Sequence, residues 1–149
     1  MKRRVLFYLL SCTWGLPMTL CGALVVGVLR LCGHPVLSFG ACRYIEIGER
    51  WGGLELGIFF LKDKTPSAHI CIHESGHAIQ NVLYGPLMPF LVSIPSAIRY
   101  HIRRIAIRRG HRPRRHYEDI WFERQATAWG MKFFGNSKEI REQSSPHSV

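Results

Sequence analysis

Acidic residues are scarce in this chain of 149 residues: ten Asp and Glu stand against twenty Lys and Arg, which gives a net charge of +10. The shortage is greatest at residues 99–116, which hold eight arginines and no acid, so the rest of the chain carries only +2. Such a concentration of positive charge indicates an anionic surface nearby, either lipid headgroups or nucleic acid.

The chain also lacks paired cysteines, internal repeats and low-complexity tracts. No CxxC pair occurs, and an odd count of five cysteines argues against a disulfide framework, so we interpret them as free thiols. Too few long apolar runs occur for a polytopic transporter, and 47% hydrophobic residues exclude a disordered tail or a collagen-like fibre. At this length we expect one domain, or one domain with a membrane anchor.

One apolar run, from Val5 to Val28, holds no charge over 24 residues, which exceeds the ~20 that a helix needs to cross a bilayer. A cleaved signal peptide has an apolar region of only ~7–15 residues that ends in a small-x-small site. This run has neither feature, so we predict a retained membrane anchor over residues 1–33. Gly15 and Pro17 stand in mid-run and permit either a kink or a tight helical hairpin.

Two strands are predicted next, at Arg43–Ile47 and Leu54–Leu61, paired as a β-hairpin across Trp51-Gly52-Gly53. Thr65-Pro66 is typical of a helix N-cap followed by proline in the first turn, and this helix should end near Tyr84.

The remaining chain should be helical. Residues 87–98 are apolar but interrupted by prolines, and as a helix they reach only ~18 Å, which suits an interfacial segment rather than a span. The helix should continue to Arg109, a further helix should cover Glu118–Phe134, and residues 136–149 should form a flexible tail. The predicted fold class is α+β, mainly α. Residues 34–135 form the domain, and residues 87–116 are its basic interfacial segment.

His73-Glu74-Ser75-Gly76-His77 is an HExxH motif within the helix predicted between Thr65 and Tyr84. Residues at i and i+4 share one face of a helix, so both imidazoles can bind one zinc ion. Glu74 projects about 100° from His73 and can reach a water at the metal rather than the metal itself. Since zinc lowers the pKa of such a water to about 7, Glu74 can take its proton as the general base.

Catalytic zinc commonly has three protein ligands, and two histidines with one glutamate is one such set. Glu123 is the best third ligand, because Ala126, Thr127 and Gly130 share its helix face and Gly76 lies on the first helix. Small residues at these positions let two helices approach closely. The simpler alternatives are two solvent-facing histidines and a solvated surface acid at Glu123.

Further residues are candidates to support a ligand or to donate to the transition-state oxygen. His69 precedes His73 by four residues and could replace Glu123, although we favour a solvent-facing or supporting role. Gln80 and Asn81 follow the motif and can cap or line the site. The candidate donors from the linker are His111, Arg112, His116 and Tyr117.

HESGH at 73–77 and ERQAT at 123–127 together resemble the HExxH … ExxA signature of gluzincin metallopeptidases. Gly76, just before the second histidine, is similar to the membrane-bound CaaX-prenyl-protease type. The resemblance covers little beyond these motifs. It implies a zincin-like core with two packed zinc-binding helices, a peptide or protein substrate and one Zn²⁺ ion. The implied ligands are His73, His77 and Glu123, with Glu74 as the general base.

Thr127 departs from that family, which often has an aspartate at this place to orient a ligating histidine. A hydroxyl can accept from an imidazole N–H, but it adds no negative charge, so lower zinc affinity or activity is expected. Intramembrane site-two proteases also use HExxH with glycine before the second histidine. Their LDG-like motif is absent here.

The eight arginines define a basic patch that follows the apolar interfacial segment directly: Arg99, Arg103, Arg104, Arg108, Arg109, Arg112, Arg114 and Arg115. This order favours the anionic headgroups of a lipid bilayer, at about 1 kcal/mol per residue. Nucleic acid is not the expected partner, because no recognisable nucleic-acid-binding module is present.

The positive-inside tendency places the basic patch, and with it the active domain, on the cytoplasmic face of a bacterial-type inner membrane. The cationic start MKRR is cytoplasmic by the same rule. Both can be so only if the apolar run doubles back, and a single span and a hairpin remain open.

The sequence therefore predicts a membrane-bound zinc metallopeptidase. Two alternatives remain: a non-catalytic membrane adaptor that keeps the fold, and a basic membrane protein that binds anionic lipid or nucleic acid.

Overall fold

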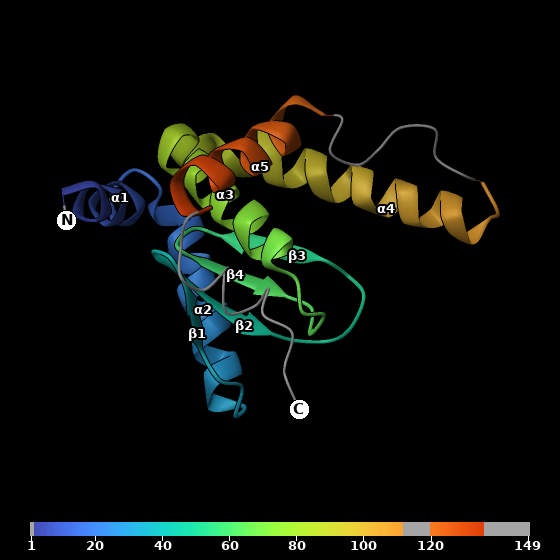
Figure 1. Cartoon of the computed structure of the whole chain (residues 1–149), viewed down its shortest axis with the longest axis horizontal. Helices are drawn as coiled ribbons and strands as arrows, with labels where there is room; N and C mark the ends of the chain where they lie inside the picture. Colours follow the sequence, from blue (N-terminus) through green and yellow to red (C-terminus); the bar gives the residue numbers. More distant parts are fainter. Residues whose placement is uncertain (1, 112–119, 136–149) are drawn as a thin grey trace.

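The computed structural model describes residues 2–111 and 120–135, which form an α+β structure that is mainly helical (Figure 1). Two helices, α1 (Lys2–Cys12) and α2 (Leu16–Leu31), precede four strands: β1 (Leu37–Phe39), β2 (Cys42–Glu46), β3 (Gly53–Leu56) and β4 (Phe59–Lys62). The rest is helical: α3 (Ala68–Tyr84), a 3₁₀ turn η1 (Gly85–Leu87), a π-helical turn η2 (Pro89–Ser93), α4 (Ile94–Arg108) and α5 (Trp121–Phe134).

The apolar N-terminal run is broken where Gly15 and Pro17 predicted a kink. Helices α1 and α2 meet at 88°, so they form a corner, and not one straight helix or a hairpin folded back on itself. Within the described part of the chain, no single helix has both the length and the apolar composition needed to cross a bilayer. Two bent pairs of helices meet that test jointly: α1 with α2, and residues 68–87 with 89–108, which are bent by 115°.

The predicted hairpin between residues 43–47 and 54–61 is wrong. The second segment is itself two strands, because Gly57 adopts a φ of +76° and turns β3 back onto β4 as an antiparallel pair. The first segment corresponds to β2, which ends at Glu46 and pairs in parallel with β4, and the sheet order is β1-β2-β4-β3. Strand β3 is therefore an edge strand, and it comes close to α3.

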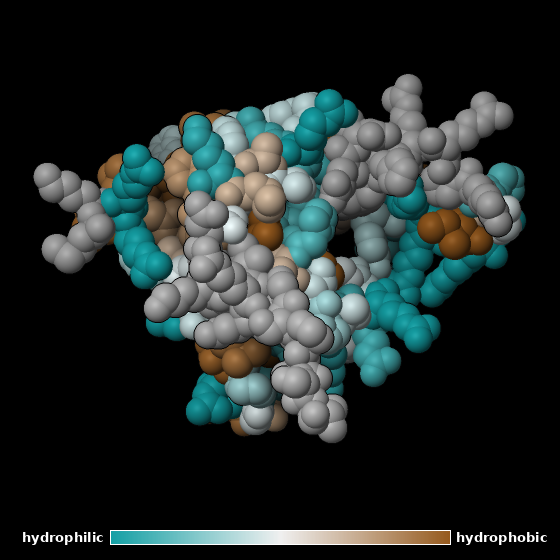
Figure 2. All heavy atoms as spheres, in the orientation of Figure 1, coloured by the Kyte–Doolittle hydropathy of each residue, from teal (hydrophilic) through white to brown (hydrophobic). Residues whose placement is uncertain are grey.

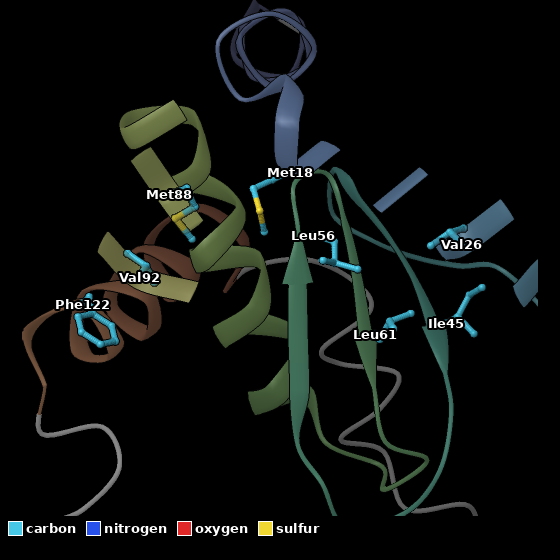
Figure 3. Packing of buried hydrophobic residues seen from close by; sticks show 8 residues of the cluster. All are labelled: Met18, Val26, Ile45, Leu56, Leu61, Met88, Val92 and Phe122. Atoms are coloured by element: carbon cyan, nitrogen blue, oxygen red, sulfur yellow. The ribbon is translucent and has the colours of Figure 1, made fainter. Parts of the chain in front are cut away.

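The sheet lies between α2 on one face and α3 on the other. On the α2 side, Met18 and Val26 pack with Ile45, Leu56 and Leu61, and Figure 3 shows these side chains together. The same cluster continues to Met88, Val92 and Phe122, beside the turns that follow α3. On the α3 side, the buried residues are Phe39, Cys42, Tyr44, Phe60, Cys71, Ile72 and Ala78.

The predicted helices are present, with shifted beginnings. Ser67, and not Thr65, is the N-cap of α3, because its hydroxyl accepts from the Ile70 N–H. Gly85 ends α3 with a φ of +53°, near the predicted stop. The helix predicted through the basic segment already begins at Ile94, and the last helix begins at Trp121.

Several predictions fall on residues outside the described part of the chain. They concern Arg112, Arg114, Arg115, His116, Tyr117, Glu118, Asp119 and the tail at 136–149.

Candidate metal centre

Three ligand atoms converge between α3 and α5. The Nε2 atoms of His73 and His77 are 3.1 Å apart. Oε2 of Glu123 lies 3.0 Å from the first and 3.2 Å from the second. Across the described residues, this is the one group of three His, Cys, Asp or Glu side chains whose ligand atoms come within 4.8 Å of one another.

Two helix glycines permit this convergence. A Cβ on Gly76 of α3 would overlap the backbone carbonyl of Ala126 on α5. A Cβ on Gly130 of α5 would overlap the carbonyl of Ile72 on α3. The two backbones therefore touch at reciprocal places, as the small residues on both helices predicted.

His73 is oriented by Thr127. The Thr127 hydroxyl donates to the backbone carbonyl of Glu123 at 3.3 Å, so its lone pairs remain to accept from Nδ1–H of His73 at 2.8 Å. This bond keeps the proton on Nδ1 and leaves Nε2 with a lone pair that points at the other two ligand atoms. The Thr127 hydroxyl thus orients the ring without the negative charge that a carboxylate would add.

His77 is oriented by Gln80. The amide nitrogen of Gln80 donates to the backbone carbonyl of Phe122 at 2.8 Å and to Oε1 of Gln125 at 2.9 Å. Its oxygen is thereby turned toward Nδ1 of His77, at 2.7 Å. Tyr84 completes the network by donating to the same Gln125 oxygen at 3.0 Å. The sequence pointed to Gln80, but it did not show the network behind it.

Glu123 is fully buried, and its second carboxylate oxygen accepts from the Ser96 hydroxyl at 2.5 Å. Burial alone would raise the pKa of this carboxyl, but its contacts with the His73 and His77 rings and the hydrogen bond from Ser96 hold it well below its usual range. The carboxyl is therefore ionised. Ser96 lies on α4, and nothing in the sequence connects it with Glu123.

This donor set fits a zinc ion. Zinc bond lengths of about 2.0–2.2 Å in a tetrahedral site place ligand atoms about 3.3–3.5 Å apart, slightly wider than the triangle here. When both Nδ1 atoms hold the ring protons, two nitrogen lone pairs and a carboxylate oxygen face one another. That arrangement needs extra protons on the rings or a cation between the three atoms, and the residues are those that zinc prefers.

Glu74 lies beside this triangle and is buried. Its carboxyl rests against Gly53 of β3, where a Cβ would overlap it. Burial raises the pKa of Glu74 to about 7; the Glu123 charge adds to the rise, and His73 opposes it. A carboxyl with this pKa can exchange a proton near neutral pH.

A cleft of about 780 Å³ opens onto the site and is bounded by β3, α3 and α4. His73, Glu74, His77 and Glu123 all line it, together with residues 52–55, from β3 and the position just before it. The far wall comes from α4, where Tyr100 and Arg104 face the cleft. Figure 2 shows an opening between α4 and the body of the molecule.

The other predicted residues lie outside the triangle. His69 is exposed and lines the cleft, with its ring centre 6.3 Å from that of His73, but it does not join the ligand group. His111 is exposed just beyond α4. Asn81 is buried and donates to the Gly15 carbonyl, so it ties α3 to the N-terminal corner instead of lining the site.

Comparison with known proteins gave no match: no family model, no curated protein and no solved structure is similar to this chain.

Proposed function

We propose that this chain is a zinc-dependent hydrolase of peptide bonds, with His73, His77 and Glu123 as the zinc ligands and Glu74 as the general base. The observation that carries the proposal is the triangle of Nε2, Nε2 and Oε2 atoms separated by 3.0–3.2 Å. Each histidine has its outer nitrogen fixed by a hydrogen-bond partner. This arrangement is usual for histidines that bind a catalytic metal.

Zinc at this place would polarise an attacking water and the carbonyl of the scissile bond. Glu74 accepts a proton from that water and returns it to the leaving amine. Its place in the cleft wall beside the triangle, and its pKa of about 7, suit both transfers. Glu123 is ionised and contributes the one negative charge of the ligand set.

Strand β3 offers a way to hold the substrate. It is the edge strand of the sheet, and residues 52–55 line the cleft next to Glu74. An extended peptide can add to such an edge through backbone hydrogen bonds, which bind many sequences alike. The resemblance to gluzincin metallopeptidases is in keeping with this class of reaction.

The test is hydrolysis of a casein-like substrate by the full-length protein, with zinc and with a chelator. We expect cleavage that the chelator abolishes and that added zinc restores. Glu74→Gln should bind zinc as the wild type does and have no activity. Cleavage retained by Glu74→Gln removes Glu74 from the base role. Zinc binding by the wild type without cleavage of any substrate favours the non-catalytic adaptor.

A further inference from the structure

Helix α4 has no buried residue, although five of its fifteen residues are isoleucines. Four of them, Ile94, Ile98, Ile102 and Ile105, fall within a sector of about 80° on a helix that turns about 100° per residue. We call these four the isoleucine stripe. Their exposed fractions are 47%, 55%, 63% and 49%.

The isoleucine stripe faces away from the cleft. The α4 residues that line the cleft include Ser96, Tyr100 and Ile107, on the opposite side of the helix. The stripe is therefore no part of the substrate wall. Phe90 and Leu91, in the turn just before α4, are also exposed. Large apolar side chains left in water in this way indicate a surface that another body covers.

The charges around the stripe indicate which kind of partner covers it. Residues 94–111 contain no acid; Arg99 and Arg108 flank the stripe, and Arg109 follows at its C-terminal end. Among the described residues, no carboxylate forms an ion pair with these three arginines. On the face seen in Figure 2, hydrophilic side chains gather along α4.

A second copy of the chain would set arginine against arginine across this stripe. Nucleic acid would bind the arginines through its phosphates but would leave the isoleucines exposed to water. An anionic bilayer satisfies both, because isoleucines enter the boundary of the acyl chains while arginines extend their guanidinium groups to the headgroups.

We propose that α4 lies in the plane of an anionic lipid bilayer, with the isoleucine stripe toward the acyl chains. The cleft then lies on the side of α4 that faces away from the bilayer. This docking requires neither the metal nor Glu74, so it stands or falls independently of the hydrolase.

The test places a polarity-sensitive fluorophore on α4 of the full-length protein reconstituted in vesicles. The exposed cysteines Cys12, Cys21 and Cys32 are first changed to serine, and Ile102→Cys and Ile107→Cys are compared in that background. Both changes remove an exposed isoleucine from α4, on opposite faces of the helix. Far-UV circular dichroism must match the parent, and the Glu74→Gln background serves as the control for independence from catalysis.

In vesicles of phosphatidylcholine with phosphatidylglycerol, we expect blue-shifted emission at position 102 and several-fold quenching by doxyl-labelled lipid. Position 107 should show neither. In phosphatidylcholine alone, quenching at 102 should fall. Equal quenching at the two positions overturns the proposal, as does a blue shift at 102 without lipid quenching, which would indicate a second copy. Water-exposed labels at both positions, with salt-dependent binding of a DNA duplex, would assign the arginines to nucleic acid and also overturn it.

Discussion

Substitutions at Thr127 test whether its hydroxyl orients the His73 ring. The gluzincin metallopeptidases, which the two motifs resemble, often have aspartate at this position. Thr127→Val keeps the shape but removes the acceptor for Nδ1–H of His73. Loss of such a partner typically lowers metal affinity 10–100-fold, and we expect a decrease of about that size. Thr127→Ser should stay within a few-fold of the wild type. Competition with a chromophoric chelator measures both affinities, and equal affinities for valine and threonine would show that the hydroxyl does not hold the ring.

Glu74 should make the metal-free protein less stable as pH rises. Its carboxyl has a pKa of about 7 in the folded chain and an ordinary value of 4.5. Between these values the folded chain holds a proton that the unfolded chain has released, so the free energy of unfolding falls as pH rises through this window. Glu74→Gln removes this pH dependence. The free energy of unfolding of the variant minus that of the wild type should therefore increase by up to about 3 kcal/mol between pH 4 and pH 8.

Unfolding by denaturant in the presence of a chelator measures this difference. Burial also raises the pKa of Glu55, and the Glu74 charge adds to that rise, so Glu55 gives a slope of the same sign. The contribution from burial is common to both proteins and cancels, whereas the smaller contribution from the Glu74 charge disappears in Glu74→Gln together with that charge. A difference between wild type and Glu74→Gln that does not change with pH would contradict the expectation.

The residues that the sequence could identify are those whose roles follow from local spacing. HExxH places two imidazoles on one helix face, and the small residues after Glu123 mark the face that contacts α3. Ser96 and Gln125 could not be found in this way. Their roles depend on where α4 and α5 pass α3, and no pattern within either segment reports that position.

At the scale of elements, the contact between α3 and α5 decides whether the ligand atoms can meet. Gly76→Ala would place a methyl group on the backbone carbonyl of Ala126 and push the helices apart. Overpacking of this kind typically costs about 1–3 kcal/mol. We expect that loss in the free energy of unfolding, together with weaker zinc binding.

Gly27→Ala is the matched control, since a Cβ at Gly27 of α2 meets no atom within 4 Å. This change should stabilise the protein by up to about 1 kcal/mol, because alanine favours a helix over glycine. If Gly76→Ala and Gly27→Ala had similar effects on zinc affinity, zinc binding would not depend on the contact between α3 and α5.

The helices were predicted better than the sheet for a physical reason. Their ends carry local markers, such as Gly85 after α3 and the prolines before α4. Thr65 and Ser67 are both suitable caps, and the hydrogen bond to Ile70 decides between them. The parallel pairing of β2 with β4 joins strands that are not neighbours in sequence, and the β3–β4 turn at Gly57 carries only one glycine.

At the scale of the whole molecule, α2 belongs to the same core as the sheet. Met18 is 8% exposed and packs in the cluster with Leu56 and Leu61, whereas Leu24, on the outer face of α2, is 71% exposed. We expect Met18→Ala to cost about 2–5 kcal/mol, as buried methionines do, and to weaken zinc binding. Leu24→Ala should change neither by much. Equal effects, measured by unfolding in a mild detergent, would mean that α2 is an anchor independent of the domain.

The account depends on one cation held by residues from α3 and α5. Elemental analysis of zinc in the full-length protein, after dialysis against metal-free buffer, tests this most directly. We predict one zinc per chain in the wild type and in Glu74→Gln, and little or none in Glu123→Ala. Absence of zinc from the wild type, or an undiminished content in Glu123→Ala, would contradict the three-ligand centre.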